Sequence, residues 1–69
     1  MRKIFLVGGG KGGTSLLKTL LHMETLKIMG VSDVNVNAPG MMEARKHGIP
    51  TCTDYTTMIT DEIEIIIEA

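Results

Sequence analysis

The residues best suited to chemistry in this chain form a glycine-rich run, Gly8–Gly13, followed twenty residues later by an aspartate, Asp33. Within the run, glycines at 8, 10 and 13 have the spacing G-x-G-x-x-G. Glycines at this spacing let backbone N–H groups approach a pyrophosphate at the start of a helix. An acid at this offset can accept hydrogen bonds from ribose hydroxyls. The pattern therefore predicts a dinucleotide ligand.

Each of these residues has a distinct expected role. Gly8 permits a tight turn out of a strand, Gly10 lets the backbone approach the phosphates, and Gly13 lets the following helix pack closely. Asp33 would repel a 2′-phosphate, and no arginine follows it, so NAD is favoured over NADP. Lys11 either screens the pyrophosphate charge or remains a solvated loop side chain.

The same residues allow three alternatives to a dinucleotide loop. The stretch Lys11–Ser15 resembles the phosphate-binding loop of nucleoside triphosphatases, but that loop needs a lysine directly before Ser or Thr, where Gly13 stands here. Glycines at 8, 10 and 12 also satisfy the looser spacing of S-adenosylmethionine sites, which stays open. The third alternative is a glycine turn that merely connects a strand to a helix.

The elements that must position these residues alternate between strand and helix. Apolar runs predict strands at 3–7, 26–34, 49–53 and 63–68, and helical patterns predict helices at 14–24, 40–47 and, weakly, 55–60. Thr14 or Ser15 can supply a hydroxyl at the start of the first helix. Pro39 can open the second helix and Gly48 can end it, while Asp54 can cap the third.

This alternation predicts an α/β fold of the Rossmann type. We expect a parallel four-stranded sheet in the order 3-2-1-4, with helices on both faces and right-handed crossovers. Pro50 suits the strand expected at the edge of the sheet. Sixty-nine residues form one thinly stabilised domain, so we expect residues 1–69 to be a single, truncated dinucleotide-binding half domain.

Composition argues against several classes of partner. The net charge is −1 and no basic cluster forms, so we expect no nucleic-acid partner. No apolar run is long enough for a membrane span or a signal peptide, and we expect a cytoplasmic protein. Cys52 is the single cysteine, so no disulfide framework or multi-cysteine metal site is expected. No catalytic constellation or metal-ligand spacing is found.

Several stretches resemble the N-terminal half of the NAD-binding domains of two enzyme groups. These groups are the Gfo/Idh/MocA oxidoreductases and the homoserine and aspartate dehydrogenases. Val31–Asn35, Ala44–Pro50 and Thr53–Tyr55 resemble their passage from the second strand to the third, and Ile63–Ala69 resembles their fourth strand. A similar segment precedes sensory modules in some bacterial signalling proteins.

The resemblance implies NAD as cofactor and a set of contacting positions. It places Gly8, Gly10, Lys11, Gly12 and Asp33 at cofactor contacts, and with Gly13 and Val34 these are the predicted cofactor-binding residues. The Glu-Lys-Pro catalytic segment of the Gfo/Idh/MocA group would lie beyond residue 69. We therefore expect an NAD-binding or sensing module or fragment, with the cofactor half of an NAD-dependent oxidoreductase and an S-adenosylmethionine-binding fragment as alternatives.

The fourth predicted strand leaves an apolar, β-branched edge. Such an edge favours pairing with another strand. We expect either a homodimer through Ile63–Ile67, in which each copy supplies the neighbouring strand of the other, or cover from a further C-terminal region.

Overall fold

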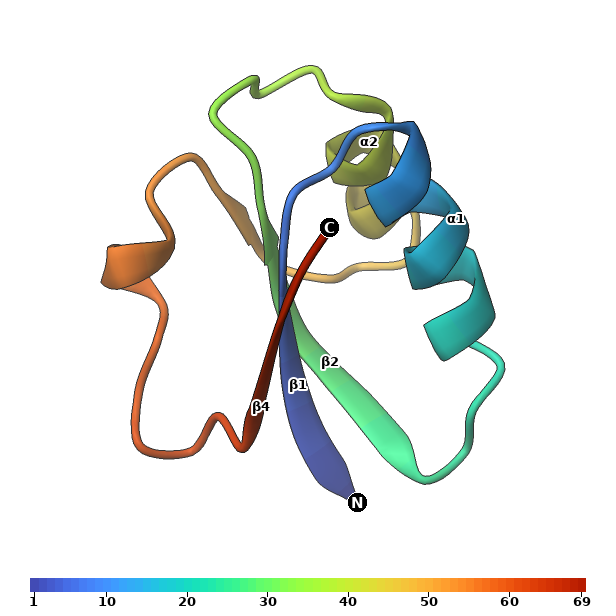
Figure 1. Cartoon of the computed structure of the whole chain (residues 1–69), viewed down its shortest axis with the longest axis vertical. Coiled ribbons are helices and arrows are strands. Elements are labelled where there is room, and N and C mark those ends of the chain that lie inside the picture. Colours follow the sequence, from blue (N-terminus) through green and yellow to red (C-terminus); the bar gives the residue numbers. More distant parts are fainter.

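The computed structural model describes residues 1–69 as a small sheet with its helices (Figure 1). The strands are β1 (Arg2–Val7), β2 (Leu26–Ser32), β3 (Thr51–Cys52) and β4 (Ile65–Glu68). The helices are α1 (Lys11–Leu20), α2 (Pro39–Lys46) and a single 3-10 turn, η1 (Tyr55–Thr57). The chain thus follows the predicted alternation of strand and helix.

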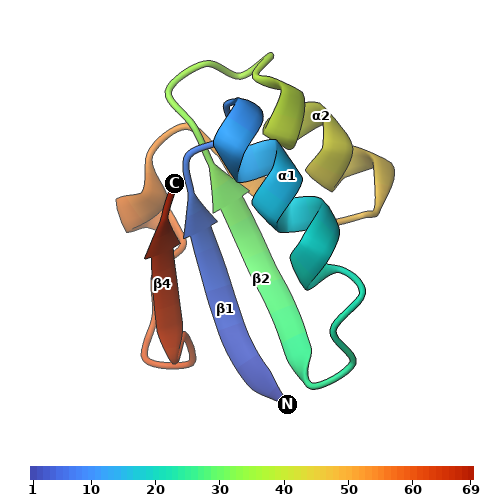
Figure 2. The same ribbon diagram turned by 45° about the vertical axis from the view of Figure 1, so that its right-hand side comes forward.

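The four strands form one parallel sheet in the order β3-β2-β1-β4, as predicted. Val7 lies opposite Ser32 on one side and Glu68 on the other, so the carboxyl ends of three strands meet at one edge (Figure 2). Ser32 in turn lies opposite Cys52 of β3. Residues that follow these strand ends are therefore brought together in space.

The two α-helices lie side by side on one face of the sheet (Figure 1). The core between them and the strands is aliphatic, and its buried members are Leu6, Leu17, Val31, Ala38, Met41 and Ala44. Leu17 and Leu20 are buried and Leu16 and Leu21 half-buried, as the helical spacing predicts. Neither helix is long and apolar enough to cross a membrane.

The other face is crossed by the connection from β3 to β4, drawn in orange in Figure 1. Phe5 is fully buried on this face, where its ring and the end of Met58 both lie against Gly30. The helix expected at 55–60 is only η1, because threonines compete for the backbone hydrogen bonds that a helix needs. Asp54 caps this turn as predicted, since its side chain accepts a hydrogen bond from the Thr56 N–H at 3.0 Å.

Several boundaries differ from the sequence-based expectation. α1 begins at Lys11 rather than at residue 14, with Gly10 as its N-cap, so the helix starts inside the glycine run. The Thr14 hydroxyl does not cap the helix, because it donates to the Gly10 carbonyl oxygen at 2.7 Å. β3 keeps only two residues, and Pro50, which has no N–H to donate, contributes its carbonyl oxygen to the Val31 N–H at 3.0 Å.

Candidate functional site

A tight turn carries the chain from β1 into α1 at the carboxyl end of the sheet. Gly8 has φ +108°, a left-handed conformation that side chains disfavour. A Cβ on Gly8 would also stand 2.5 Å from the carbonyl oxygen of Ala69, which follows β4. The Ala69 N–H donates to the Val7 carbonyl oxygen at 2.9 Å, so the end of β4 lies directly beside the turn. Gly8 therefore makes the tight turn out of β1 that was expected of it.

The start of α1 packs directly on this turn. A Cβ on Gly13 would stand 2.0 Å from the carbonyl oxygen of Gly8, which is too close for any side chain. The glycine therefore allows the helix axis to approach the end of β1, as its place in the spacing predicts. As a result, the first turn of α1 stands above the edge where the strands end (Figure 2).

The first turn of α1 presents backbone donors to open space. The Thr14 N–H donates to the Gly10 carbonyl oxygen at 2.8 Å, so the N–H groups of the three residues between them precede the first helical hydrogen bond. Apart from chain neighbours and the helix's own backbone, no atom lies within 4 Å of the Cβ position of Gly10 or Gly12, so there is open space beside the start of α1. Free N–H groups and the positive end of the helix dipole together attract an anion.

Lys11 is the first residue of α1, and the first turn holds no acidic residue. A cation at the N-terminus of a helix is repelled by the helix dipole, which makes this position unfavourable for lysine in the free protein. An anion bound at the same end would reverse the sign of this interaction. Lys11 is exposed, so its ammonium group is free to approach an anion at this end of the helix.

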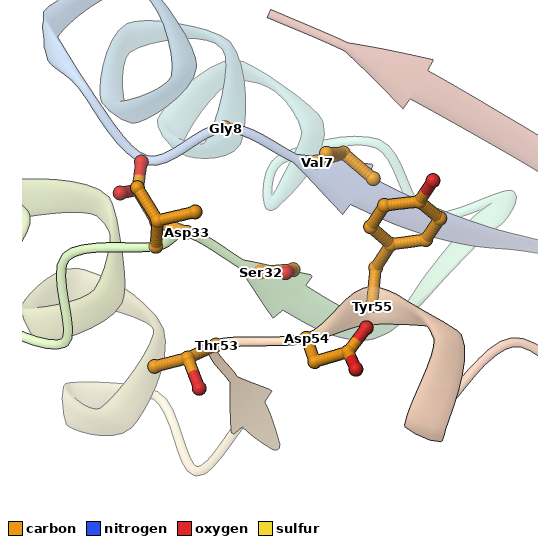
Figure 3. Close-up of a pocket in the computed structure, with 8 residues that line it drawn as sticks. Val7, Gly8, Ser32, Asp33, Thr53, Asp54 and Tyr55 are labelled. Carbon is orange, nitrogen blue, oxygen red and sulfur yellow. The ribbon is translucent and has the colours of Figure 1, made fainter.

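Asp33 directly follows β2 and turns toward the glycine run (Figure 3). Its Oδ2 accepts a hydrogen bond from the Gly9 N–H at 2.7 Å, and its Oδ1 accepts one from the Asn35 N–H at 2.8 Å. The Asn35 hydrogen bond first, and the Gly9 hydrogen bond second, lower the pKa of this carboxyl below its ordinary value. A carboxylate has about four acceptor sites, so Asp33 keeps capacity for ribose hydroxyls.

Gly9, which the sequence reasoning did not assign a role, lies at the centre of this arrangement. The residue is buried, and its carbonyl oxygen accepts a hydrogen bond from the Gly40 N–H in the first turn of α2 at 2.7 Å. Its own N–H is held by Asp33. The extra glycine within the run was the available signal, because a position so enclosed leaves little room for a side chain.

A pocket of about 410 Å³ opens beside Asp33 at the carboxyl ends of β1, β2 and β3. It is lined by Val7, Gly8, Ser32, Asp33, Val34, Thr53, Asp54 and Tyr55 (Figure 3). Ser32 is the only buried residue with a polar side chain, and Val7 and the Tyr55 ring also line the pocket. The volume lies within the range of small-molecule sites.

The structure brings the predicted residues together in two neighbouring groups. Gly8, Asp33 and Val34 line the pocket, whereas the other four predicted residues belong to the N-terminus of α1, namely Gly10, Lys11, Gly12 and Gly13. The contacts of Asp33 and Gly40 with Gly9 link the two groups. Ser32 and the β3–β4 connection were missed as pocket residues, although parallel strands predict that residues after β1, β2 and β3 share one edge.

The chain has no cluster of three or more potential metal ligands among its His, Cys, Asp and Glu side chains.

Comparison with known proteins supports this architecture. No protein-family model matches the chain. In sequence it is similar to acetaldehyde dehydrogenase 5 of Rhodococcus jostii (strain RHA1), with 29% identity over 72 residues that cover 96% of this chain and 22% of that protein. In structure it is similar to an NAD-binding protein from Listeria innocua, with a TM-score of 0.75 and 18% sequence identity, over 99% of this chain and 20% of that one. The fold is Rossmann-like. The chain spans about a fifth of the length of each of these two proteins.

Proposed function

We propose that this chain binds NAD(H), and that the ADP part of the dinucleotide supplies most of its contacts. The observation that carries the proposal is the joint placement of an open helix N-terminus and an acid at the end of β2, both at the carboxyl edge of the sheet. Dinucleotides bind at this edge of doubly wound sheets. The likeness to a protein described as NAD-binding supports the same ligand.

Each part of the ligand has a candidate partner in the chain. The N–H groups at the start of α1 and the Lys11 ammonium group would hold the pyrophosphate. Asp33 would accept hydrogen bonds from the adenosine ribose, and the pocket between Val34 and Tyr55 would receive the base. The open space at the Cβ positions of Gly10 and Gly12 fits this assignment, because it is the space that the phosphates would need.

The role proposed first is that of a ligand-binding or sensing module in the cytoplasm. A second candidate, favoured by the likeness to an acetaldehyde dehydrogenase, is the cofactor half of an NAD-dependent oxidoreductase. Bound NAD would then supply the hydride chemistry, and this chain would bind and orient its adenosine and pyrophosphate. Substrate contacts would come from residues outside the 69 described here.

Calorimetric titration of the 69-residue chain with NAD, ADP-ribose and S-adenosylmethionine tests the proposal. We expect NAD and ADP-ribose to bind, and Gly10→Ala to weaken both by about tenfold or more, because a methyl group would occupy the phosphate space and displace a charge-assisted hydrogen bond. Ser15→Ala, on the exposed side of the same helix, is the matched control and should bind normally. Binding of S-adenosylmethionine alone would favour the methyl-donor alternative, and a folded chain that binds none of the three would overturn the proposal.

A further inference from the structure

Asp33 is held by backbone groups on two sides. Both of its carboxylate oxygens accept backbone hydrogen bonds, one from Gly9 at 2.7 Å and one from Asn35 at 2.8 Å. The two donors lie on opposite sides of Asp33 in the sequence, one in the β1–α1 turn and one in the loop after β2. The carboxylate therefore links the β1–α1 turn to the loop after β2. Gly9 and Asp33 are 24 residues apart in the sequence.

Gly9 is held through both of its backbone polar groups. Its N–H donates to Asp33, and its carbonyl oxygen accepts from the Gly40 N–H at 2.7 Å and from the Thr14 hydroxyl at 3.3 Å. Gly9 directly precedes Gly10, the N-cap of α1. The N–H groups at the start of α1 therefore come directly after a residue whose own N–H is held by Asp33.

We propose that Asp33 is a positioning residue for the phosphate-binding turn in addition to its role as ribose acceptor, so that ribose and pyrophosphate are recognised as one coupled unit. The inference rests on the proposed function, because it concerns the same ligand site. It assigns to Asp33 an effect on a part of the ligand that the carboxylate itself does not touch.

The same geometry bears on selectivity against 2′-phosphorylated ligands. A carboxylate that is free at the end of a strand can rotate away from a 2′-phosphate. Asp33 can do so only by giving up the Gly9 and Asn35 hydrogen bonds, which would loosen the phosphate-binding turn. Rejection of a 2′-phosphate thus combines charge repulsion with the loss of a well-placed pyrophosphate site.

A ligand without ribose hydroxyls separates the two roles of Asp33. We would titrate wild type and Asp33→Asn with ADP and with 2′,3′-dideoxy-ADP, which keeps the base and both phosphates. If Asp33 positions the turn, Asp33→Asn should weaken dideoxy-ADP binding by about tenfold as well as weakening ADP binding. If Asp33 only binds ribose, the variant should lose affinity for ADP but bind dideoxy-ADP as wild type does, which would overturn the inference.

A measurement without ligand keeps the inference testable if neither nucleotide binds, an outcome that would count against the proposed function alone. In amide ¹H–¹⁵N spectra, the Gly9 and Asn35 resonances of wild type should titrate together as Asp33 is protonated at acid pH. In Asp33→Asn, the resonances of Gly9, Gly10 and Gly12 should shift. Asp61→Asn, a charge-matched change at an exposed site in the β3–β4 connection, should leave them in place. Unmoved glycine resonances in a folded Asp33→Asn variant would overturn the positioning role.

Discussion

A Cβ on Gly13 would stand 2.0 Å from the carbonyl oxygen of Gly8, so the first turn of α1 rests directly on the turn that ends β1. This contact sets the height of the helix above the sheet. It also brings the helix N–H groups to the edge where Asp33 and the pocket lie. The close approach of Gly13 to Gly8 therefore helps to position the proposed site.

Gly13→Ala should destabilise the chain because the added methyl group cannot fit without moving α1 away from β1. We expect a loss of about 1–3 kcal/mol in the free energy of unfolding, measured by urea denaturation. Gly12→Ala is the matched control, since its Cβ would meet open space and alanine favours a helix by up to about 1 kcal/mol over glycine. Equal stabilities for the two variants would contradict this account of the close approach.

The order of elements could be predicted from the sequence because buried apolar residues recur at the spacing of a helix or a strand. Leu17 and Leu20 follow helical spacing, and the run Ile4–Val7 reads as a buried strand, so the alternation and the order of the sheet follow. The weak elements were less predictable. η1 and β3 span three and two residues, which is too few to leave a periodic pattern in the sequence.

Candidate site residues could be predicted where the backbone demands glycine, or where an acid stands at the expected spacing, as at Asp33. Gly8 and Gly13 stand where a side chain would collide, so their spacing shows in the sequence. Ser32 and Tyr55 belong to the pocket because parallel strands end together and a connection folds over them, and this depends on three-dimensional packing. The role of Gly9 depends likewise on contacts with Asp33 and α2.

Lys11→Glu should change stability and ligand affinity in opposite directions. The free helix gains a favourable charge at its N-terminus, and we expect it to be stabilised by about 0.3–1 kcal/mol at low ionic strength. Binding of ADP-ribose should fall by more than tenfold, because a carboxylate would then face the pyrophosphate. Thermal unfolding and calorimetry at two salt concentrations measure the two effects. Lys18→Glu, on the same helix away from its N-terminus, is the control for net charge. Unchanged affinity in Lys11→Glu would remove Lys11 from the site.

Ser32→Ala tests whether the base enters the pocket. Ser32 is 2% exposed and lines the pocket, so its hydroxyl is placed to form a hydrogen bond with a ligand there. We expect the affinity for ADP-ribose to fall about three- to tenfold, as for the loss of one neutral hydrogen bond, and the affinity for ribose 5-phosphate to stay the same. An equal loss for both ligands would mean that the substitution disturbs the neighbouring Asp33 instead.

The loss of stability at acid pH should depend in part on the hydrogen bonds of Asp33. The folded chain lowers the pKa of this carboxyl, so its stabilising contribution is present above the ordinary pKa of 3.8 and is lost as the pH falls through the lower folded value. Glu43, Asp54 and Glu64 also have lowered pKa values, so wild type should lose stability below about pH 4 for several reasons. The Asp33→Asn variant should lose less stability than wild type over the same pH range. Melting temperatures from pH 7 to pH 2 give the comparison, and parallel curves would contradict it.

The free edge of β4 should promote self-association. β4 pairs with β1 on one side only, and Ile65 and Ile66 are 39% and 51% exposed. We predict that two copies pair antiparallel through β4 about a two-fold axis, since this satisfies the unpaired backbone groups of both edges and covers the isoleucines. Sedimentation velocity over a concentration series should show a dimer that Ile66→Lys abolishes. Met23→Lys, an exposed site in the α1–β2 turn, should leave the dimer intact. A wild-type chain that stays monomeric at every concentration would refute the pairing.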